Sequence, residues 1–408
     1  MLDRRHFLHG AGALAAAGAA GLPGAGWSAE RPKLSDELSA GTREAAVLDA
    51  LPGKQPLIKL SYRPPNYETP LSYFSSTITP NDAFFVRYHL ADIPEVDVRT
   101  WKLKVGGDGA TTPLELSLAE LRRLEQVEVT AVCQCSGNRR GLFNPHVTGV
   151  QWGVGAMGNA RWKGVRLKDV LAKAGVRKET VEVVLDGADG PVVDKTPDFI
   201  KSIPIWKALD DTVLIALEMN GQPLPAWNGF PARLIVPGWT GTYWMKHLTS
   251  IELVQKPYEG FWMKSAYRIP KGKFALVDRF LTQETEQNTP ITEMVVNSLI
   301  TGPAPGQRIA ARQPVTVAGI AWDGGYGIQS VEVSPDNGAT WQPATLGDDV
   351  GRFSFRAFSA RLSFAKAGAQ TILAKATNRL GASQPRELIQ NPAGYHHNLV
   401  ARVAVTVA

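Results

Sequence analysis

The chain has 408 residues, of which 44% are apolar and 20% are charged. At about 150 residues per domain, this length predicts two or three domains with a large buried core. The 39 glycines and 28 prolines indicate many turns, and the composition excludes a disordered or collagen-like chain. The net charge of +6 comes from basic residues that are scattered along the chain, so nucleic-acid binding is not indicated.

The chain has only two cysteines, Cys133 and Cys135. Two cysteines cannot form a disulfide framework, an all-cysteine zinc site or an iron-sulfur cluster. The sequence has no Cys-x-x-Cys-His motif for covalent haem. Any thiol chemistry therefore depends on one or two sulfur atoms.

Residues 1–29 resemble a twin-arginine export signal, because Arg4 and Arg5 precede an Ala/Gly-rich stretch over 10–26. Glycines and a proline interrupt that stretch, so we expect no membrane span in the mature protein. The twin-arginine route carries folded proteins, often with a cofactor already inserted. The signal therefore predicts a periplasmic protein with a cofactor.

Two helices and several strands are predicted in the first part of the chain. Ser117 and Glu120 have the spacing of a capping box for a helix that ends near residue 124. A second helix is predicted over 166–174, with Gly175 ending it. The order of these elements favours an α+β fold. Strands are predicted over 83–89, 101–105, 126–133 and 181–185.

From about residue 287 the pattern changes to alternating polar and apolar residues between turns. This pattern predicts an immunoglobulin-like sandwich without an inter-sheet disulfide. The domains are therefore predicted as a signal over 1–29, an α+β catalytic domain over 30–286 and an all-β domain over 287–408. The predicted strands of the last domain are 315–322, 328–336, 351–358, 370–377 and 399–407.

The two cysteines lie where a predicted strand gives way to the loop CSGNRRG. Cys133 and Cys135 are two residues apart, so both should point to one face of the strand. Arg139 and Arg140 follow closely, and nearby positive charge favours a thiolate. Cys135 is thus a candidate metal ligand or nucleophile, with two buried apolar cysteines as the alternative. A disulfide between them is not expected on geometric grounds.

Several motifs, in this order, resemble those of the sulfite oxidase family of molybdenum enzymes. The likeness extends from about residue 55 to the C-terminus. The segment AYRIP, the export signal and the absence of a haem segment make the bacterial periplasmic members most similar. The motifs are FFVRYH (84–89), CSGNRRG (135–141), GNARWKGVRL (158–167), SIPIWKALD (202–210), EMNGQPLPAWNGFPARLIVPGW (218–239) and GIAWDGGYGIQSVEVSPDNGATW (319–341).

The resemblance implies a molybdenum site at Cys135, whose thiolate would bind the metal beside the dithiolene sulfurs of molybdopterin. Cys133 is not required by that motif. Arg87 and Arg140 match positions around the anion pocket, where guanidinium groups hold oxyanions. Tyr267 matches an active-site tyrosine that can bind a substrate oxygen and relay a proton. The family also has a tryptophan in the substrate pocket, matched here by Trp152.

For the cofactor, the resemblance implies contacts from His89, Arg233 and Lys246 to the pterin and its phosphate. His89 lies two residues beyond Arg87, so both should face one pocket if the strand continues. The pattern departs from vertebrate members at two positions. Asn228 stands where those members have histidine and is a candidate hydrogen-bonding replacement, and Tyr243 stands where they have arginine.

The implied activity is the oxidation of sulfite to sulfate at molybdenum, with no haem in this chain and a c-type cytochrome as electron acceptor. The last domain resembles the family's dimerisation module, which leaves open a homodimer or a pairing with a cytochrome subunit. Two other readings remain. One is a molybdopterin-dependent reductase acting on a sulfoxide or on nitrate, and the other is a non-enzymatic scaffold protein with an immunoglobulin-like domain.

Overall fold

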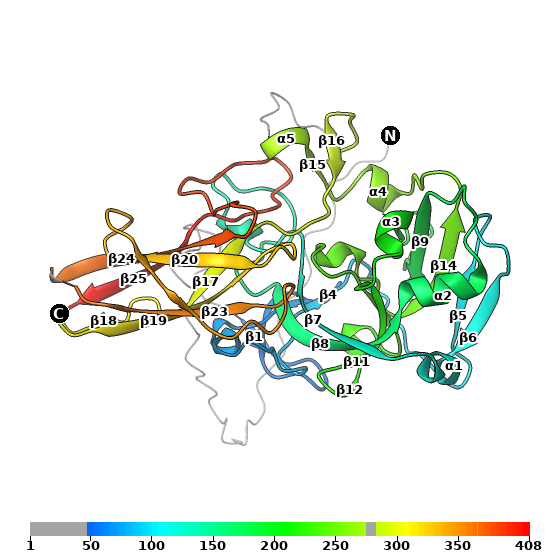
Figure 1. The fold of residues 1–408 in the computed structure, drawn as a ribbon, viewed down its shortest axis with the longest axis horizontal. Coiled ribbons are helices and arrows are strands. Elements are labelled where there is room, and N and C mark those ends of the chain that lie inside the picture. Colours follow the sequence, from blue (N-terminus) through cyan, green and yellow to red (C-terminus); the bar gives the residue numbers. More distant parts are fainter. Residues whose placement is uncertain (1–46, 275–282, 365) are drawn as a thin grey trace, which may run out of the picture. The chain divides into compact units, whose positions relative to one another are not determined.

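The structure is a computed structural model that describes residues 47–274, 283–364 and 366–408. The predicted export signal over 1–29 lies outside the described residues. Within the described part, no helix is long and apolar enough to cross a membrane. Figure 1 shows the order of the elements along the chain.

The first part of the described chain is mostly β-structure, built from three sheets and a few short helices. In the second sheet only β14 (Leu248–Val254) and β5 (Lys102–Gly106) pair in parallel, and the other neighbours are antiparallel. The first sheet has the order β1 (Leu48–Asp49), β2 (Leu57–Ser61), β3 (Asn66–Glu68) and β4 (Val86–Arg87). The second has the order β10 (Lys201–Pro204), β9 (Glu182–Gly187), β14 (Leu248–Val254), β5 (Lys102–Gly106) and β6 (Leu114–Ser117).

The third sheet ends next to the two cysteines. Its edge strand, β7 (Val127–Gln134), contains Cys133 and ends just before Cys135. It pairs with β8 over eight residues, from Val127 opposite Gly164 to Gln134 opposite Met157. The sheet has the order β12 (Gln222–Pro223), β11 (Leu214–Met219), β8 (Met157–Arg166) and β7 (Val127–Gln134), with β13 (Arg233–Ile235) paired to β11.

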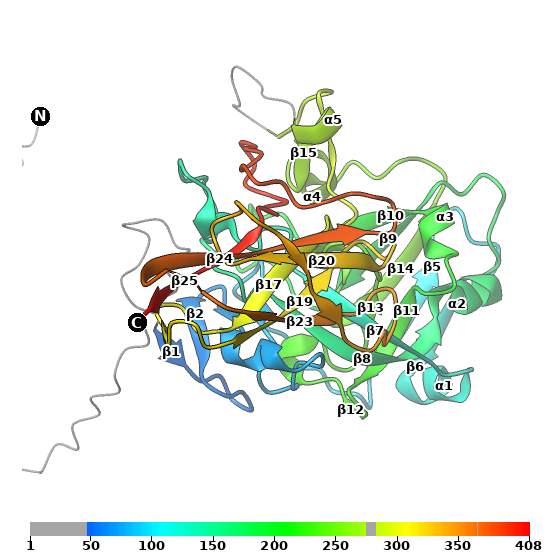
Figure 2. The same ribbon diagram turned by 60° about the vertical axis from the view of Figure 1, so that its left-hand side comes forward.

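Both predicted helices are confirmed. Ser117 accepts a hydrogen bond from the backbone of Glu120, whose carboxylate accepts from the backbone of Ser117, so the capping box closes α1 (Leu118–Arg123). α2 (Leu167–Ala174) ends at Gly175, whose φ is 67°. Figures 1 and 2 show both helices near β5 and β6. The remaining helices are α3 (Ile205–Ala208), α4 (Phe261–Lys264) and α5 (Lys271–Phe274), with 3-10 turns η1 (Leu71–Ser75), η2 (Arg140–Leu142), η3 (Ala226–Asn228) and η4 (Gly241–Tyr243).

The last part of the chain forms two sheets around one apolar core, after a short pair of strands, β15 (Arg268–Pro270) and β16 (Asn288–Pro290). Figure 1 shows the two sheets as separate layers. One has the order β17 (Asn297–Gly302), β19 (Val315–Trp322), β23 (Arg356–Leu362) and β22 (Thr345–Leu346). The other has the order β18 (Arg308–Ile309), β25 (Ala401–Val407), β24 (Gly368–Asn378), β20 (Ile328–Ser334) and β21 (Gln342–Pro343).

Two predicted strands were wrong in extent. Residues 83–89 form a strand only at Val86–Arg87, because only these two residues pair with β3, whereas the backbone of Ala83 closes a turn by donating to the carbonyl of Pro80. The strand predicted over 351–358 begins instead at Arg356. Gly351 has a φ of 138° and its carbonyl accepts from the backbone of Ser354, which makes this stretch a turn.

The last part packs closely against the strand that carries the cysteines. Trp322 Nε1 of β19 donates to Oε1 of Gln134 at 2.7 Å, and the backbone of Val132 donates to the carbonyl of Phe353 at 2.9 Å. Phe74 and Val132 share an apolar cluster with side chains of β17 and β19. The end of β7 is therefore held from both parts of the chain.

Candidate active site

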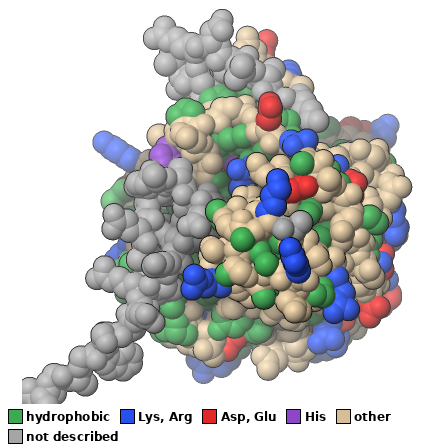
Figure 3. Space-filling view, turned by 90° about the vertical axis from the view of Figure 1, so that its left-hand side faces the viewer, with side chains coloured by type: hydrophobic (Ala, Val, Ile, Leu, Met, Phe, Trp, Pro, Cys, Tyr) green, Lys and Arg blue, Asp and Glu red, His purple; other side chains and the backbone are tan. Residues whose placement is uncertain are grey.

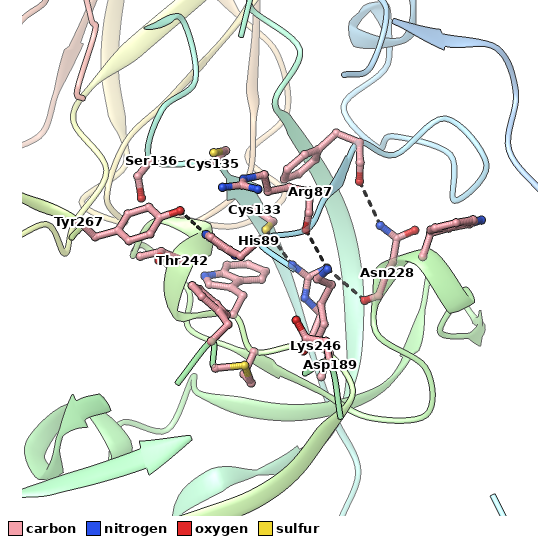
Figure 4. A pocket seen from close by; sticks show the side chains of 17 residues that line it. Arg87, His89, Cys133, Cys135, Ser136, Asp189, Asn228, Thr242, Lys246 and Tyr267 are labelled. Carbon is pink, nitrogen blue, oxygen red and sulfur yellow. Dashed lines mark hydrogen bonds between the residues drawn. The ribbon is translucent and has the colours of Figure 1, made fainter. Parts of the chain in front are cut away.

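A cavity lies at the end of β7 and is lined by residues from widely separated segments. Figure 4 shows Arg87, Cys133 and Cys135 near its centre, with Tyr267 pointing towards His89. The lining also includes Asn228, Arg233 and Lys246. The fold thus brings seven of the nine predicted site residues to one cavity.

The loop after β7 presents Cys135 to the cavity with 8% of its surface exposed. The backbone of Cys135 donates to the carbonyl of Ala156, and its carbonyl accepts from the backbone of Asn138. Both cysteines are free and line the same cavity, as the two-residue spacing predicted. The thiol of Cys133 is fully buried and accepts from Arg233 Nη2 at 3.3 Å. Burial raises the pKa of Cys133 to about 11, so this thiol stays protonated at neutral pH.

Positive charge dominates the cavity wall, where Arg87, Arg233 and Lys246 meet a single carboxylate, Asp189. Lys246 Nζ donates to the backbone carbonyl of Arg87 at 2.8 Å, which fixes the Lys246 side chain to β4. Burial holds the pKa of Lys246 well below its ordinary value, although the charge of Asp189 opposes this shift. The guanidinium groups of Arg87 and Arg233 already outnumber the single carboxylate, so the arrangement attracts an anion.

Three polar groups on this wall lack a hydrogen-bond partner among the described residues. They are Nε of Arg87, Nε of Arg233 and Oγ1 of Thr242, and all three atoms are buried. A buried donor without an acceptor costs free energy. These atoms are therefore candidates to bind a ligand rich in acceptor oxygens or nitrogens.

Asn228 lies on the cavity wall, but its side-chain amide is already engaged within the protein. Its Oδ1 accepts from Lys54 Nζ at 2.6 Å, and its Nδ2 donates to the carbonyl of Phe85 at 3.2 Å. Its backbone carbonyl accepts from Arg233 Nη1 at 3.2 Å. Asn228 therefore orients Arg233 and anchors Lys54, and its predicted contact with the cofactor stays a prediction.

Tyr267 and His89 form a hydrogen-bonded pair between the phenol oxygen and Nε2. The ring of His89 stacks on Phe199, with 3.6 Å between centroids. Burial and the charges of nearby cations, first Arg87, hold the pKa of His89 well below its ordinary value. Burial raises the pKa of Tyr267. At neutral pH the phenol of Tyr267 therefore keeps its proton and the imidazole of His89 is neutral.

The backbone of Tyr267 has a φ of 57°, in the left-handed region that residues with a side chain rarely adopt. Its carbonyl accepts from the backbone of Ile291 at 2.9 Å, which fixes this conformation. Such backbone geometry is found often at functional sites. Here it directs the phenol of Tyr267 towards His89.

Arg140 and Trp152 do not line the cavity in this structure. Arg140 is 8% exposed and its guanidinium lies over the ring of Tyr395, which in turn stacks on Tyr267 with 5.8 Å between centroids. Trp152 is fully buried within the main core cluster, where its carbonyl accepts from the backbone of Gly141. The substrate-binding roles of Arg140 and Trp152 stay predictions.

The residues around the site that were not found from the sequence include Lys54, Asp189, Lys201, Thr242 and Tyr395. Each contacts the site from a distant segment, so no local spacing marks it. The one available signal was Lys201, a cation inside the otherwise apolar run FIKSIPI over 199–205. Tyr243, the second position at which the sequence departs from the expected pattern, is buried against Trp239 and does not line the cavity.

Comparison with known proteins identifies the family. Residues 89–262 match the oxidoreductase molybdopterin binding domain, and residues 288–408 match the Mo-co oxidoreductase dimerisation domain. Sulfite oxidase of Arabidopsis thaliana is 32% identical over 327 residues, which cover 76% of this chain and 81% of that protein. The chain belongs to the sulfite oxidase family.

Two further comparisons support this assignment. Mitochondrial sulfite oxidase of Rattus norvegicus is 38% identical over 304 residues, which are 72% of this chain and 54% of that protein. The chain thus spans about half the length of that relative. The crystal structure of the sulfane dehydrogenase SoxCD from Paracoccus pantotrophus matches with a TM-score of 0.72 and 27% identity, covering 85% of both chains.

The cavity residues fit molybdopterin, which is anionic and rich in hydrogen-bonding atoms. The three unpartnered polar groups and the cations of the wall suit its phosphate and ring system. Within the described residues, no group of three or more His, Cys, Asp or Glu side chains is placed to hold a metal. A metal at Cys135 would therefore need its other ligands from the cofactor, as a dithiolene provides.

Proposed function

We propose that this chain oxidises sulfite to sulfate with a molybdenum-molybdopterin cofactor and passes the electrons to a c-type cytochrome in the periplasm. The observation that carries the proposal is the position of Cys135 in a cavity whose wall holds Arg87, Arg233 and Lys246. Membership of the sulfite oxidase family supports the choice of substrate. When bound, the cofactor supplies the two-electron chemistry.

The protein's own groups bind and orient the two anions. In this proposal Cys135 Sγ holds the metal, while Arg233, Lys246 and Thr242 hold the pterin and its phosphate. Arg87 faces the substrate, because its unpartnered Nε lies on the same wall as Cys135. Sulfite offers few apolar contacts, so guanidinium groups contribute most of its binding free energy.

Conversion of sulfite and water to sulfate releases two protons and two electrons. The hydrogen-bonded pair of Tyr267 and His89 is placed to accept or pass on a proton at the cavity wall. With the pKa of His89 lowered and that of Tyr267 raised, neither residue carries a net charge at neutral pH. A proton that enters the pair at one residue and leaves from the other passes through without a lasting change in the charge of the pair.

The electron acceptor and the assembly follow from the same proposal. The last domain, which we assign as immunoglobulin-like on its two packed sheets, matches a dimerisation domain and supports a homodimer. Pairing with a cytochrome subunit is the other assembly.

On the face that Figure 3 shows, Lys and Arg side chains are dispersed among other residues, as expected for a surface without a nucleic-acid-binding stripe.

The proposal is tested by the metal content of the purified protein and by reduction of cytochrome c with sulfite. We expect bound molybdenum and turnover with sulfite, which Arg87→Gln should reduce by raising KM at least tenfold. Turnover with a sulfoxide or nitrate and none with sulfite would support a reductase instead. Protein without molybdenum, expressed in a host that makes the cofactor, would support a scaffold role.

A further inference from the structure

Lys201 of β10 is a buried cation next to the active site. Its side chain is 0% exposed, and its Nζ donates to the carbonyl of Trp262 at 2.6 Å. The same Nζ lies 4.7 Å from the ring centroid of Tyr243 and 5.3 Å from that of Tyr267. Within residues 47–274, 283–364 and 366–408, no carboxylate forms an ion pair with Lys201.

Stability alone does not explain this cation. Burying an ammonium group without a carboxylate costs free energy, and one carbonyl and two ring faces compensate only partly. An apolar side chain of similar volume would fill the same space without that cost. Burial, with the charge of Arg268 on β15 adding to it, lowers the pKa of Lys201 to about 7.

The contacts of Lys201 lead directly to the residues that face the cavity. Tyr267, against which Nζ lies, is hydrogen-bonded to His89. Trp262, which accepts the Lys201 hydrogen bond, packs on the ring of His89 with 4.9 Å between centroids. The positive charge of Lys201 is also one of those that lower the pKa of His89. One buried side chain thus supports both members of the proton-handling pair.

We propose that Lys201 is a positioning residue that holds Tyr267 against the cavity and adds positive potential at the site of the bound oxyanion. This inference rests on the proposed function only in taking sulfate or sulfite as the anion. The groups that face Nζ are the rings of Tyr243 and Tyr267, the carbonyl of Trp262 and the guanidinium of Arg268, with His89 beyond Tyr267.

The test measures the affinity of the molybdenum-loaded enzyme for sulfate by isothermal titration calorimetry, below and above pH 7. Sulfate keeps both negative charges over this range, so its own titration does not interfere. In the wild type, affinity should fall as pH rises through about 7, because Lys201 loses its charge. Lys201→Met should bind sulfate about tenfold more weakly below pH 7 and like the wild type well above it.

Two control variants separate charge from structure. Lys201→Arg keeps the charge and should retain tight binding on both sides of pH 7. Lys104→Met removes an exposed lysine on β5 and should behave like the wild type. Because the lost charge has no carboxylate partner, Lys201→Met should melt at or above the wild-type temperature. If Lys201→Met does not fold, Lys201→Gln takes its place in the same measurements.

Each outcome decides between the two proposals. Equal sulfate affinity of wild type and Lys201→Met at every pH, with equal molybdenum content, would overturn the role of Lys201 while sulfite turnover stands. Failure of the wild type to oxidise sulfite, with the Lys201 effect on sulfate binding intact, would overturn the proposed function alone. A wild type that binds no sulfate would overturn the role of Lys201.

Discussion

The guanidinium carbon of Arg140 lies 4.9 Å from the centroid of the Tyr395 ring. Arg140 belongs to the loop that carries Cys135, whereas Tyr395 belongs to the segment before β25 in the last part of the chain. Tyr395 also stacks on Tyr267. A single ring from the last part of the chain thus contacts both a predicted anion-binding residue and the Tyr267 ring that lines the cavity.

This relationship predicts the effect of removing the ring. Tyr395→Leu should raise KM for sulfite about tenfold, because a buried cation–π contact contributes ~1–2 kcal/mol to the position of Arg140. Tyr395→Phe keeps the ring and should stay near the wild type. Steady-state kinetics of both variants check this, with Tyr326→Leu, at a partly exposed tyrosine of the same domain, as the control. Equal KM values for Tyr395→Leu and the wild type would contradict the role of the ring.

Gly137 provides a second way to displace Arg140. A Cβ at this position would lie 2.5–2.7 Å from three atoms of the Arg140 guanidinium, so the arginine side chain must move in Gly137→Ala. We expect KM to rise several-fold with little change in the melting temperature, since a flexible side chain and not the backbone is displaced. Gly190→Ala is the matched control, because a Cβ there meets no atom within 4 Å. A loss of stability without a change in KM would contradict this account.

The two cysteines should respond differently to the same substitution. Cys135→Ser should fold but contain little molybdenum and lose nearly all activity, because serine replaces the soft sulfur ligand with a hydroxyl. Cys133→Ser should keep the metal, since burial raises the pKa of this thiol to about 11 and keeps it protonated. Metal analysis of both proteins, beside their circular dichroism spectra, measures the difference. Full molybdenum content in Cys135→Ser would exclude Cys135 as the ligand.

Three buried histidines make the free energy of unfolding depend on pH in the acidic range. Burial lowers the pKa of His247 and His397 to about 3 and that of His396 to about 4, so all three are neutral in the folded protein at pH 5. The unfolded chain protonates them below about pH 6.5, so their contribution to stability is present above that pH and is lost as pH falls towards 3. Burial raises the pKa of Asp186 to about 7, so its contribution to stability has the opposite dependence and is lost as pH rises through 7.

The slope of this dependence can be measured on a single variant. Near pH 5 the three histidines take up three protons on unfolding and Asp186 releases one, a net uptake of about two from these groups. Urea unfolding of the wild type and of His247→Gln at a series of pH values gives the free energy of unfolding of each protein as a function of pH. We expect the slope of the unfolding free energy against pH to fall by about one proton in the variant. Parallel slopes would show that His247 titrates alike in both states.

The sequence predicted the elements whose signals are local. The capping box of Ser117 and Glu120, the glycine after α2 and the alternation of β19 each depend on residues within one segment, and each is confirmed. The shared face of Cys133 and Cys135 follows from strand geometry in the same way.

Contacts between distant segments could not be predicted from spacing. Lys54 and Asn228 are 174 residues apart, and their hydrogen bond takes up the amide that the sequence offered as a cofactor contact. Tyr395 meets Arg140 only because two parts of the chain pack together. The position of Trp152 could not be predicted either, since the sequence does not show that this side chain lies in the core and not on the cavity wall.

The hydrogen bond from Arg139 Nη2 to the carbonyl of Ser298, at 2.6 Å, has a consequence for folding cooperativity. Arg139 lies in the Cys135 loop and is 2% exposed, so detaching β17 would take this acceptor from a buried guanidinium. The bond between Gln134 and Trp322 would break in the same event. The molybdopterin-binding part of the chain therefore depends on the last part for a rigid Cys135 loop, and heating should melt both parts in one calorimetric transition.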